Sequence, residues 1–179
     1  MHGLVSLLPD PYYSKVSEVW EELDNRFGLK GVQVTPLPHF SWQIGENYNF
    51  DKLEEAMKGI TSRTKPFTVR TTGLGIFSGD EPVIFIQIVK TVELITLHGE
   101  IWEECGQFCE GISQYYSPQN WMPHISLVYK DVDTENIPEA MEWLAFQSYD
   151  WEMVVDNLSF IYEPEGEFSS LKYSFPFIG

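Results

Sequence analysis

A five-residue pattern occurs twice in this chain of 179 residues, and its repetition constrains the fold more than any other feature. Residues 38–42 read Pro-His-Phe-Ser-Trp, and residues 123–127 read Pro-His-Ile-Ser-Leu. The two histidines are 85 residues apart (124 minus 39), which is close to half the chain. We therefore expect an internal duplication, with two halves built on the same plan.

The hydrophobic periodicity predicts the same order of elements in each half: strand, helix, strand, helix, strand. This order predicts a single domain over residues 1–179 with two pseudo-symmetric lobes, approximately 1–80 and 81–179. Each lobe is expected to hold a sheet with two helices, and a central cleft is expected between the lobes. Expected strands are 4–8, 38–44, 67–71 with 75–77, 83–89, 121–129, 153–162 and 171–177, the last two joined by a turn at 164–166. Expected helices are 11–27, 49–60, 91–109 and 137–144.

The repeated pattern presents one imidazole and one hydroxyl on the same face of each strand. Side chains alternate along a strand, so His39 lies beside Ser41, and His124 beside Ser126. Two such strands around one cavity supply the groups needed for displacement at phosphorus. Imidazole, with an ordinary pKa of about 6.5, serves as base or acid near neutral pH, and hydroxyls hold the oxygens where charge builds. A single copy of the pattern would more often be structural, and the repetition favours catalysis.

With these motifs the chain resembles the 2H phosphoesterase superfamily, which includes 2'-5' RNA ligase and cyclic phosphodiesterase proteins. His39-Phe40-Ser41 and His124-Ile125-Ser126 match its two His-x-Ser/Thr motifs, and residues 158–162 with 171–173 are similar to its closing hairpin. The resemblance implies a two-lobed α+β fold with an antiparallel-rich sheet in each lobe. It also implies catalysis with no metal and no cofactor, and 2',3'-cyclic or 2'-5' phosphodiester substrates. His39 and His124 would be acid and base in an unassigned order, and Ser41 and Ser126 would bind the phosphate. Asp80-Glu81 departs from the arginine that ligase-like members often carry there, which weighs against ligation.

The composition restricts the partners of the chain. Eleven basic against 27 acidic residues give a formal net charge of -16, which disfavours long duplex nucleic acid but leaves a small cyclic nucleotide or an RNA-end phosphodiester open. No apolar stretch is long enough to span a membrane, and the N-terminus does not resemble a signal peptide. We expect a soluble, cytoplasmic monomer that does not bind membranes. Cys105 and Cys109 are predicted to be reduced thiols on one helix face rather than a disulfide or a metal site.

The sequence is compatible with two alternative functions: a nucleotide-binding regulatory module with little turnover, and an RNA 2'-5' ligase. A carboxylate-held metal site is disfavoured because no tight acidic cluster supports it. Strand alternation predicts that Trp42 and Tyr129 lie in the core, opposite the histidines, and leaves Trp121 undecided. His98 is predicted to have a packing or surface role outside the site.

Overall fold

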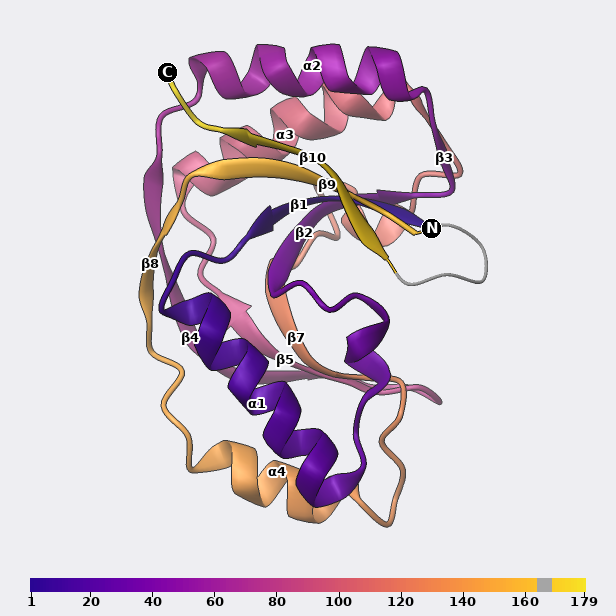
Figure 1. Cartoon of the computed structure of the whole chain (residues 1–179), viewed down its shortest axis with the longest axis vertical. Coiled ribbons are helices and arrows are strands. Elements are labelled where there is room, and N and C mark those ends of the chain that lie inside the picture. Colours follow the sequence, from indigo (N-terminus) through magenta and orange to yellow (C-terminus); the bar gives the residue numbers. More distant parts are fainter. Residues whose placement is uncertain (164–168) are drawn as a thin grey trace.

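A computed structural model of the chain describes residues 1–163 and 169–179, so the turn expected at 164–166 lies outside the described residues. Within these residues, two four-stranded antiparallel sheets form the centre of the molecule, and α-helices cover them at both ends (Figure 1). The predicted α+β class with antiparallel sheets is confirmed.

The first sheet has the strand order β10-β9-β1-β2, and the second has the order β7-β5-β4-β8. Helices α2 and α3 lie at the end of the first sheet, and α1 and α4 lie at the other end of the molecule (Figure 1). The strands of the first sheet are β1 (His2–Leu7), β2 (His39–Gly45), β9 (Asn157–Tyr162) and β10 (Ser170–Pro176). Those of the second are β4 (Phe67–Phe77), β5 (Val83–Ile88), β7 (His124–Tyr129) and β8 (Glu152–Val155). The helices are α1 (Tyr12–Phe27), α2 (Phe50–Arg63), α3 (Val92–Gly106) and α4 (Ile137–Ala145). The short pieces are β3 (Asn47–Tyr48) paired with β6 (Cys109–Glu110), and the 3-10 turns η1 (Gly31–Val34) and η2 (Gln114–Tyr116).

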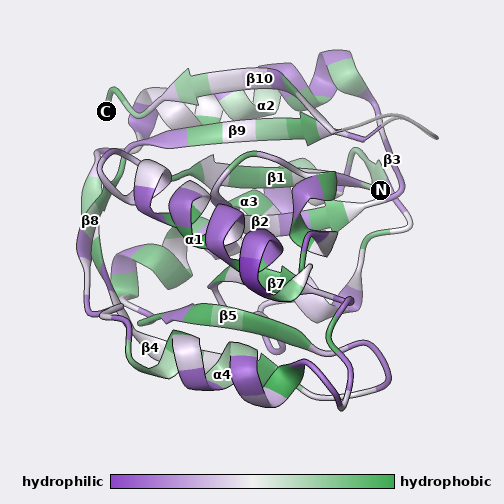
Figure 2. Ribbon diagram, turned by 60° about the horizontal axis from the view of Figure 1, so that its bottom comes forward, coloured by the Kyte–Doolittle hydropathy of each residue, from purple (hydrophilic) through white to green (hydrophobic). Residues whose placement is uncertain are grey.

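The helices begin and end where local chemistry favours it. The side chain of Asn49 accepts a hydrogen bond from a first-turn amide of α2, and that of Thr91 does the same for α3. Gly28 ends α1 with a positive φ of 70°, a conformation that costs glycine little. Each helix buries apolar residues on one side, and the hydrophilic colour on the turns of α1 that face the viewer in Figure 2 marks its polar side.

The two sheets are built in the same order but not from separate halves of the chain. β2-β1-β9-β10 corresponds to β7-β5-β4-β8, yet β9 and β10 come from the second half and β4 comes from the first. The predicted division of the lobes near residue 80 is therefore wrong at the level of the sheets. The third strand of each half pairs with the other half, which joins the lobes into one hydrogen-bonded structure.

Three further boundaries differ from the prediction. Residues 153–162 form two strands rather than one, because the chain crosses at Asp156 from β8, paired with β4, to β9, paired with β1. Residues 67–77 form one strand with an irregularity between Thr71 and Leu74. The helix predicted to reach Cys109 ends at Gly106, since Cys109 is paired with Tyr48 in the β3–β6 ladder. The two free thiols therefore do not share a helix face; Cys105 is buried and Cys109 is half-buried.

None of the helices in the described residues is long and apolar enough to span a bilayer.

Candidate active site

The two motif histidines begin the two edge strands that face one another. β2 is the last strand of the first sheet and β7 is the first strand of the second, and the two are in contact. His39 and His124 are both half-buried, so neither ring is sealed in the core. The His39 Nδ1 lies 2.5 Å from the carbonyl oxygen of Leu37, and the His124 Nδ1 lies 2.7 Å from that of Met122. A carbonyl only accepts, so Nδ1 carries the hydrogen, and Nε2 of each neutral ring is left with a free lone pair.

A β-bulge follows the serine in each motif. On β2, Ser41 pairs with Val5 and Gln43 pairs with Leu4, so Trp42 is the extra residue. On β7, the same break makes Leu127 the extra residue, again 85 positions later (127 minus 42). Bulges interrupt the ladder and redirect side chains, and they are frequent beside active sites. The duplication thus extends to backbone irregularity, which the sequence pattern did not reveal.

At each bulge, the serine carbonyl accepts a hydrogen bond from an indole outside the motif strand. The Trp121 Nε1–H donates to the Ser41 carbonyl at 2.9 Å, and the Trp20 Nε1–H, from α1, donates to the Ser126 carbonyl at 3.0 Å. A buried carbonyl without a partner would cost about 1–3 kcal/mol, so these bonds stabilise the bulged conformation. Both serine side chains remain half-buried on the same side as the histidines.

Burial governs the electrostatics of both imidazoles. Desolvation lowers the pKa of His39 to about 4, against an opposing effect of the Leu37 carbonyl and with a smaller lowering from His124. The pKa of His124 is also lowered by desolvation, opposed by the Met122 carbonyl. Both rings are therefore neutral in the free protein at neutral pH.

The two rings have different neighbours. The His124 ring lies edge-on to Phe77, with centroids 4.9 Å apart, and 5.1 Å from the ring of Phe85. Gly75 makes room for this cluster, since a Cβ there would come within 2.5 Å of the Phe85 ring. No comparable pair of aromatic rings surrounds His39 in the described residues. Aromatic faces attract a cation, so this surrounding favours a protonated His124 relative to a purely aliphatic one.

A stack of buried rings supports the Ser41 side. His98 lies parallel to Trp121 at 3.8 Å, and Trp121 stacks on Trp42 at 5.4 Å. Trp42 is fully buried, as strand alternation predicted, and Trp121 is buried too, so neither offers a face to a nucleobase. His98 is 2% exposed, and its Nε2 lies 3.0 Å from the Tyr116 carbonyl. The sequence carried a signal for this role, because His98 falls on the same helical stripe as the buried Leu94 and Ile101.

Tyr129 corrects the prediction made from strand alternation. The bulge at Leu127 makes Leu127 and Val128 consecutive buried residues, so the alternation shifts and Tyr129 is half-buried, as His124 is. Its phenol contributes to raising the pKa of Tyr116, and the Ser41 side chain lowers the pKa of the same phenol. Two tyrosines that sequence reasoning left out of the site therefore border the motif strands. The period-two argument fails here because a bulge adds one residue to the count.

Comparison with known proteins now identifies the family. A family model described as the 2'-5' RNA ligase superfamily matches residues 11–167. The chain belongs to the 2'-5' RNA ligase superfamily. Among curated relatives, a Bacillus cytotoxicus protein with a provisional phosphoesterase assignment is 22% identical over 165 residues, covering 92% of this chain and 90% of that protein.

Solved structures of the 2'-5' RNA ligase superfamily share the fold. A Thermus thermophilus protein has a TM-score of 0.67 at 17% identity, covering 99% of this chain and 98% of that one. Escherichia coli LigT complexed with 3'-AMP has a TM-score of 0.63 at 13% identity, with the same coverage of both chains. The predicted resemblance to the 2H phosphoesterases is confirmed, and membership supports phosphodiester chemistry in general.

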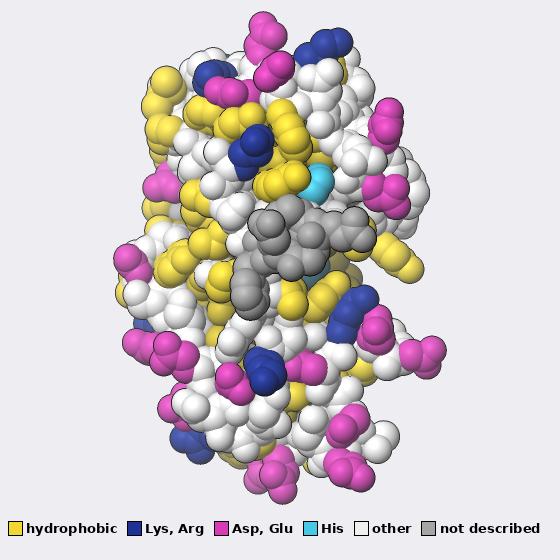
Figure 3. Space-filling view, turned by 45° about the vertical axis from the view of Figure 1, so that its right-hand side comes forward, with side chains coloured by type: hydrophobic (Ala, Val, Ile, Leu, Met, Phe, Trp, Pro, Cys, Tyr) yellow, Lys and Arg dark blue, Asp and Glu magenta, His cyan; other side chains and the backbone are white. Residues whose placement is uncertain are grey.

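Two basic residues at the second sheet are paired with acidic side chains. Lys130 lies 2.7 Å from Glu81, and Arg70 lies 2.9 Å from Asp150. Both pairs are exposed, so they contribute little to stability. Glu81, one of the two acidic residues before β5, is thus partnered by a lysine. Figure 3 shows one face of the molecule, where acidic side chains are spread mainly along the periphery and hydrophobic side chains gather in its upper part.

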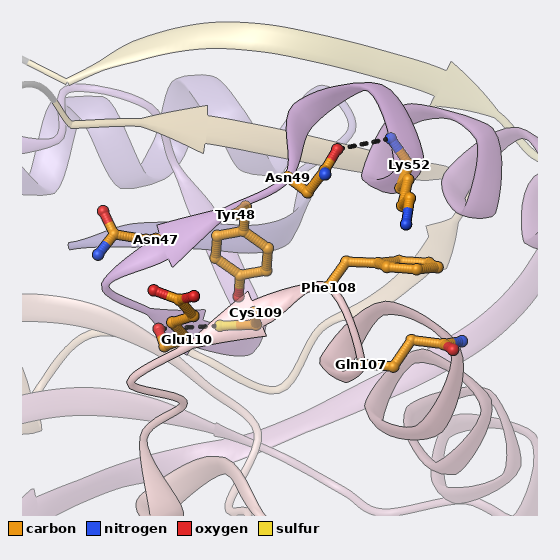
Figure 4. A pocket seen from close by; sticks show the side chains of 8 residues that line it. All are labelled: Asn47, Tyr48, Asn49, Lys52, Gln107, Phe108, Cys109 and Glu110. Carbon is orange, nitrogen blue, oxygen red and sulfur yellow. Dashed lines mark hydrogen bonds between the residues drawn. The ribbon is translucent and has the colours of Figure 1, made fainter.

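A pocket of about 310 Å³ lies away from the motifs, where β3, β6 and the start of α2 meet (Figure 4). Its lining consists of Asn47, Tyr48, Asn49, Lys52, Gln107, Phe108, Cys109 and Glu110. The lining contains no imidazole, and the Asn49 side chain already caps the helix. It therefore offers no acid–base pair of the kind at the motif strands. In the described part of the chain, no group of three or more His, Cys, Asp or Glu side chains is arranged to hold a metal ion.

Proposed function

We propose that this chain is a metal-independent phosphodiesterase that opens 2',3'-cyclic nucleotides or related 2'-5' phosphodiesters, with His39 and His124 as the acid–base pair. The observation that carries this proposal is the matched anchoring of two imidazoles on facing strands, each held through Nδ1 with Nε2 free. Two such nitrogens can perform both proton transfers of the reaction without a metal. The structure of LigT with 3'-AMP, a nucleotide-sized ligand on the same fold, agrees with a small substrate.

The proposed hydrolysis is a displacement at phosphorus in which two protons are transferred. A water oxygen attacks phosphorus while the basic Nε2 takes one of its protons, and the bond from phosphorus to the 3' oxygen breaks. The second imidazole, which has become an imidazolium with the phosphodiester anion bound, gives its Nε2 proton to that oxygen and returns to the neutral form, which leaves a nucleoside 2'-phosphate. The hydroxyls of Ser41 and Ser126 donate hydrogen bonds to the non-bridging oxygens, where negative charge builds.

The unequal surroundings favour one order of roles. Burial lowers the pKa of His39 to about 4, which suits a ring that must begin the reaction neutral. The Phe77 and Phe85 rings beside His124 favour its cationic form, and the bound phosphodiester anion favours it further. We therefore assign His39 as the base and His124 as the acid.

The proposed partner is a small cyclic nucleotide or an RNA end. A net charge of -16 repels a long duplex, whose binding depends on neutralising many phosphates. We propose that the chain acts as a monomer, because one copy carries both motif strands.

The decisive experiment measures hydrolysis of the four 2',3'-cyclic nucleotides in excess chelator, with the product identified by phosphorus NMR. His39→Ala and His124→Ala should each reduce kcat by about 100- to 10,000-fold, the usual contribution of an acid or base. His2→Gln is the matched control. His2 stacks on Tyr162 at one end of β1, whereas His39 pairs with Leu7 at the other end of the same strand.

Four outcomes would contradict the proposal. Turnover by His39→Ala at the wild-type rate would remove the acid–base assignment. Loss of wild-type activity in chelator would replace it with metal catalysis. Saturable binding of a nucleoside 2'-phosphate by wild-type protein without any turnover would instead identify a nucleotide-binding module, and a joined 2'-5' RNA product would identify a ligase.

A further inference from the structure

Tyr116 lies beside the motif strand β2 but outside the two motifs. It ends η2, which contacts β2, and the Ser41 side chain lies near enough to its phenol to lower the pKa of that phenol. The phenol of Tyr129, at the end of β7, raises the pKa of the Tyr116 phenol. The neighbouring Tyr115 is 85% exposed, whereas Tyr116 is half-buried. One phenol of the pair therefore points toward the motif strands, and the other points to solvent.

The backbone of Tyr116 is held by the same rings that hold the backbone of Ser41. The Nε2–H of His98 donates to the Tyr116 carbonyl at 3.0 Å, and His98 stacks on Trp121 at 3.8 Å. The Trp121 indole donates to the Ser41 carbonyl at 2.9 Å. Two stacked rings thus hold the backbones of both segments, from which the phenol and the Ser41 hydroxyl project, before any substrate binds. This is the arrangement that preorganised donors require.

The phenol is suited to donate a hydrogen bond and not to transfer a proton. Burial, with a smaller effect of Tyr129, raises the pKa of Tyr116 to about 12, while Ser41 opposes the rise. The group therefore stays protonated throughout the physiological pH range. Among the described residues, η1, the 3-10 turn that contacts β7, reads Gly-Val-Gln-Val and carries no phenol. A tyrosine from a 3-10 turn is therefore present on the His39 side alone.

We propose that Tyr116 binds substrate directly, donating a hydrogen bond to a non-bridging oxygen of the phosphodiester beside Ser41. This inference rests on the proposed function, which it extends by a third hydroxyl and by an asymmetry between the two motifs. The phosphodiester is thereby held by two donors on the His39 side and by one on the His124 side. Its orientation in the cleft is fixed, so that one ester oxygen faces each imidazole.

The test is a double-mutant cycle on hydrolysis of 2',3'-cyclic AMP. Tyr116→Phe is made in the wild-type chain and in Ser41→Ala, with Tyr115→Phe as the exposed control. A direct bond to a charged phosphate predicts a loss of about 10- to 100-fold in kcat/KM in both backgrounds. Tyr115→Phe should match its parent. Affinity for adenosine 2'-phosphate, measured by calorimetry, should fall in the same Tyr116→Phe variants, and their thermal unfolding should be close to that of their parents.

The outcomes separate this inference from the proposed function. If Tyr116→Phe has no effect, or loses its effect once Ser41 is alanine, the tyrosine acts through Ser41 or not at all, and the inference is overturned. If wild-type protein binds adenosine 2'-phosphate without turnover and Tyr116→Phe weakens that binding, the inference stands and the proposed function fails. Absence of binding and of turnover in the wild type overturns both.

Discussion

His98 offers a quantitative test of how the support behind Ser41 responds to pH. The ring is 2% exposed, and burial lowers its pKa to about 4; the Tyr116 and Trp42 backbones oppose the shift and Lys90 adds to it. In the unfolded chain a histidine has a pKa of about 6.5. Above pH 6.5 both states are neutral, and the ring contributes no pH dependence. Between pH 6.5 and 4 only the unfolded state binds the proton, so stability decreases as the pH falls.

The size of the effect follows from the two pKa values. Each pH unit in this window is equivalent to about 1.4 kcal/mol, so His98 alone should lower the free energy of unfolding by about 2 kcal/mol at pH 5 relative to pH 7. His98→Gln removes the titration but keeps an amide that can donate to the Tyr116 carbonyl. The variant should therefore lose about 2 kcal/mol less than the wild type over this interval.

The assay is urea denaturation of both proteins at pH 7 and pH 5, followed by tryptophan fluorescence. The carboxylates and the other histidines are common to both proteins and cancel in the comparison. Equal losses in the two proteins would refute the reasoning, because they would mean that His98 has the same pKa folded and unfolded. A variant that is already unfolded at pH 7 would show instead that the ring stack with Trp121 is required for folding, so His98→Asn, of smaller volume, is measured in parallel.

Three further predictions concern the site itself. Trp121→Phe keeps the stacked ring but removes the hydrogen bond to the Ser41 carbonyl. The free energy of unfolding should therefore fall by about 1–3 kcal/mol, and kcat/KM should fall with it. Unchanged values of both would show that the bulge needs no donor. Gly75→Ala places a Cβ against the Phe85 ring and should cost about 1–3 kcal/mol in denaturant unfolding, whereas a neutral result would mean that the ring moves freely. The acidic limb of kcat/KM should have its inflection near pH 4, where His39 becomes protonated, and an inflection near 6.5 would contradict its role as the base.

Much of the site could be predicted from the sequence because it rests on short-range regularities. The repeated pentapeptide located the two motif strands, and alternation placed His39 beside Ser41 and His124 beside Ser126 on one side. The helix stop at Gly28 followed from the preference of glycine for positive φ. These features depend on a few neighbouring residues, so the amino-acid sequence suffices to find them.

What could not be predicted depends on pairing between distant segments. The exchange of β4 and β9 between the sheets leaves no local pattern, because the hydrophobic pattern of a strand is the same whichever strand it pairs with. The crossing at Asp156 was missed for the same reason, since both sheets accept an alternating strand. Tyr116 was missed because it lies in an irregular segment, where periodicity gives no information about direction.

The duplication and the proposed reaction make opposite demands on this site. Copying one motif gives two imidazoles with the same anchor, the same bulge and the same indole bond, and therefore no intrinsic difference in role. An in-line displacement needs one ring to accept a proton and the other to donate one. The difference must therefore come from residues outside the motifs. The paired strands already differ there: Leu7 lies opposite His39, whereas the amide-bearing Gln87 lies opposite His124. Exchanging these two residues should thus shift the pH profile of turnover while leaving both motifs intact, and an unchanged profile would place the asymmetry in the aromatic rings and Tyr116 alone.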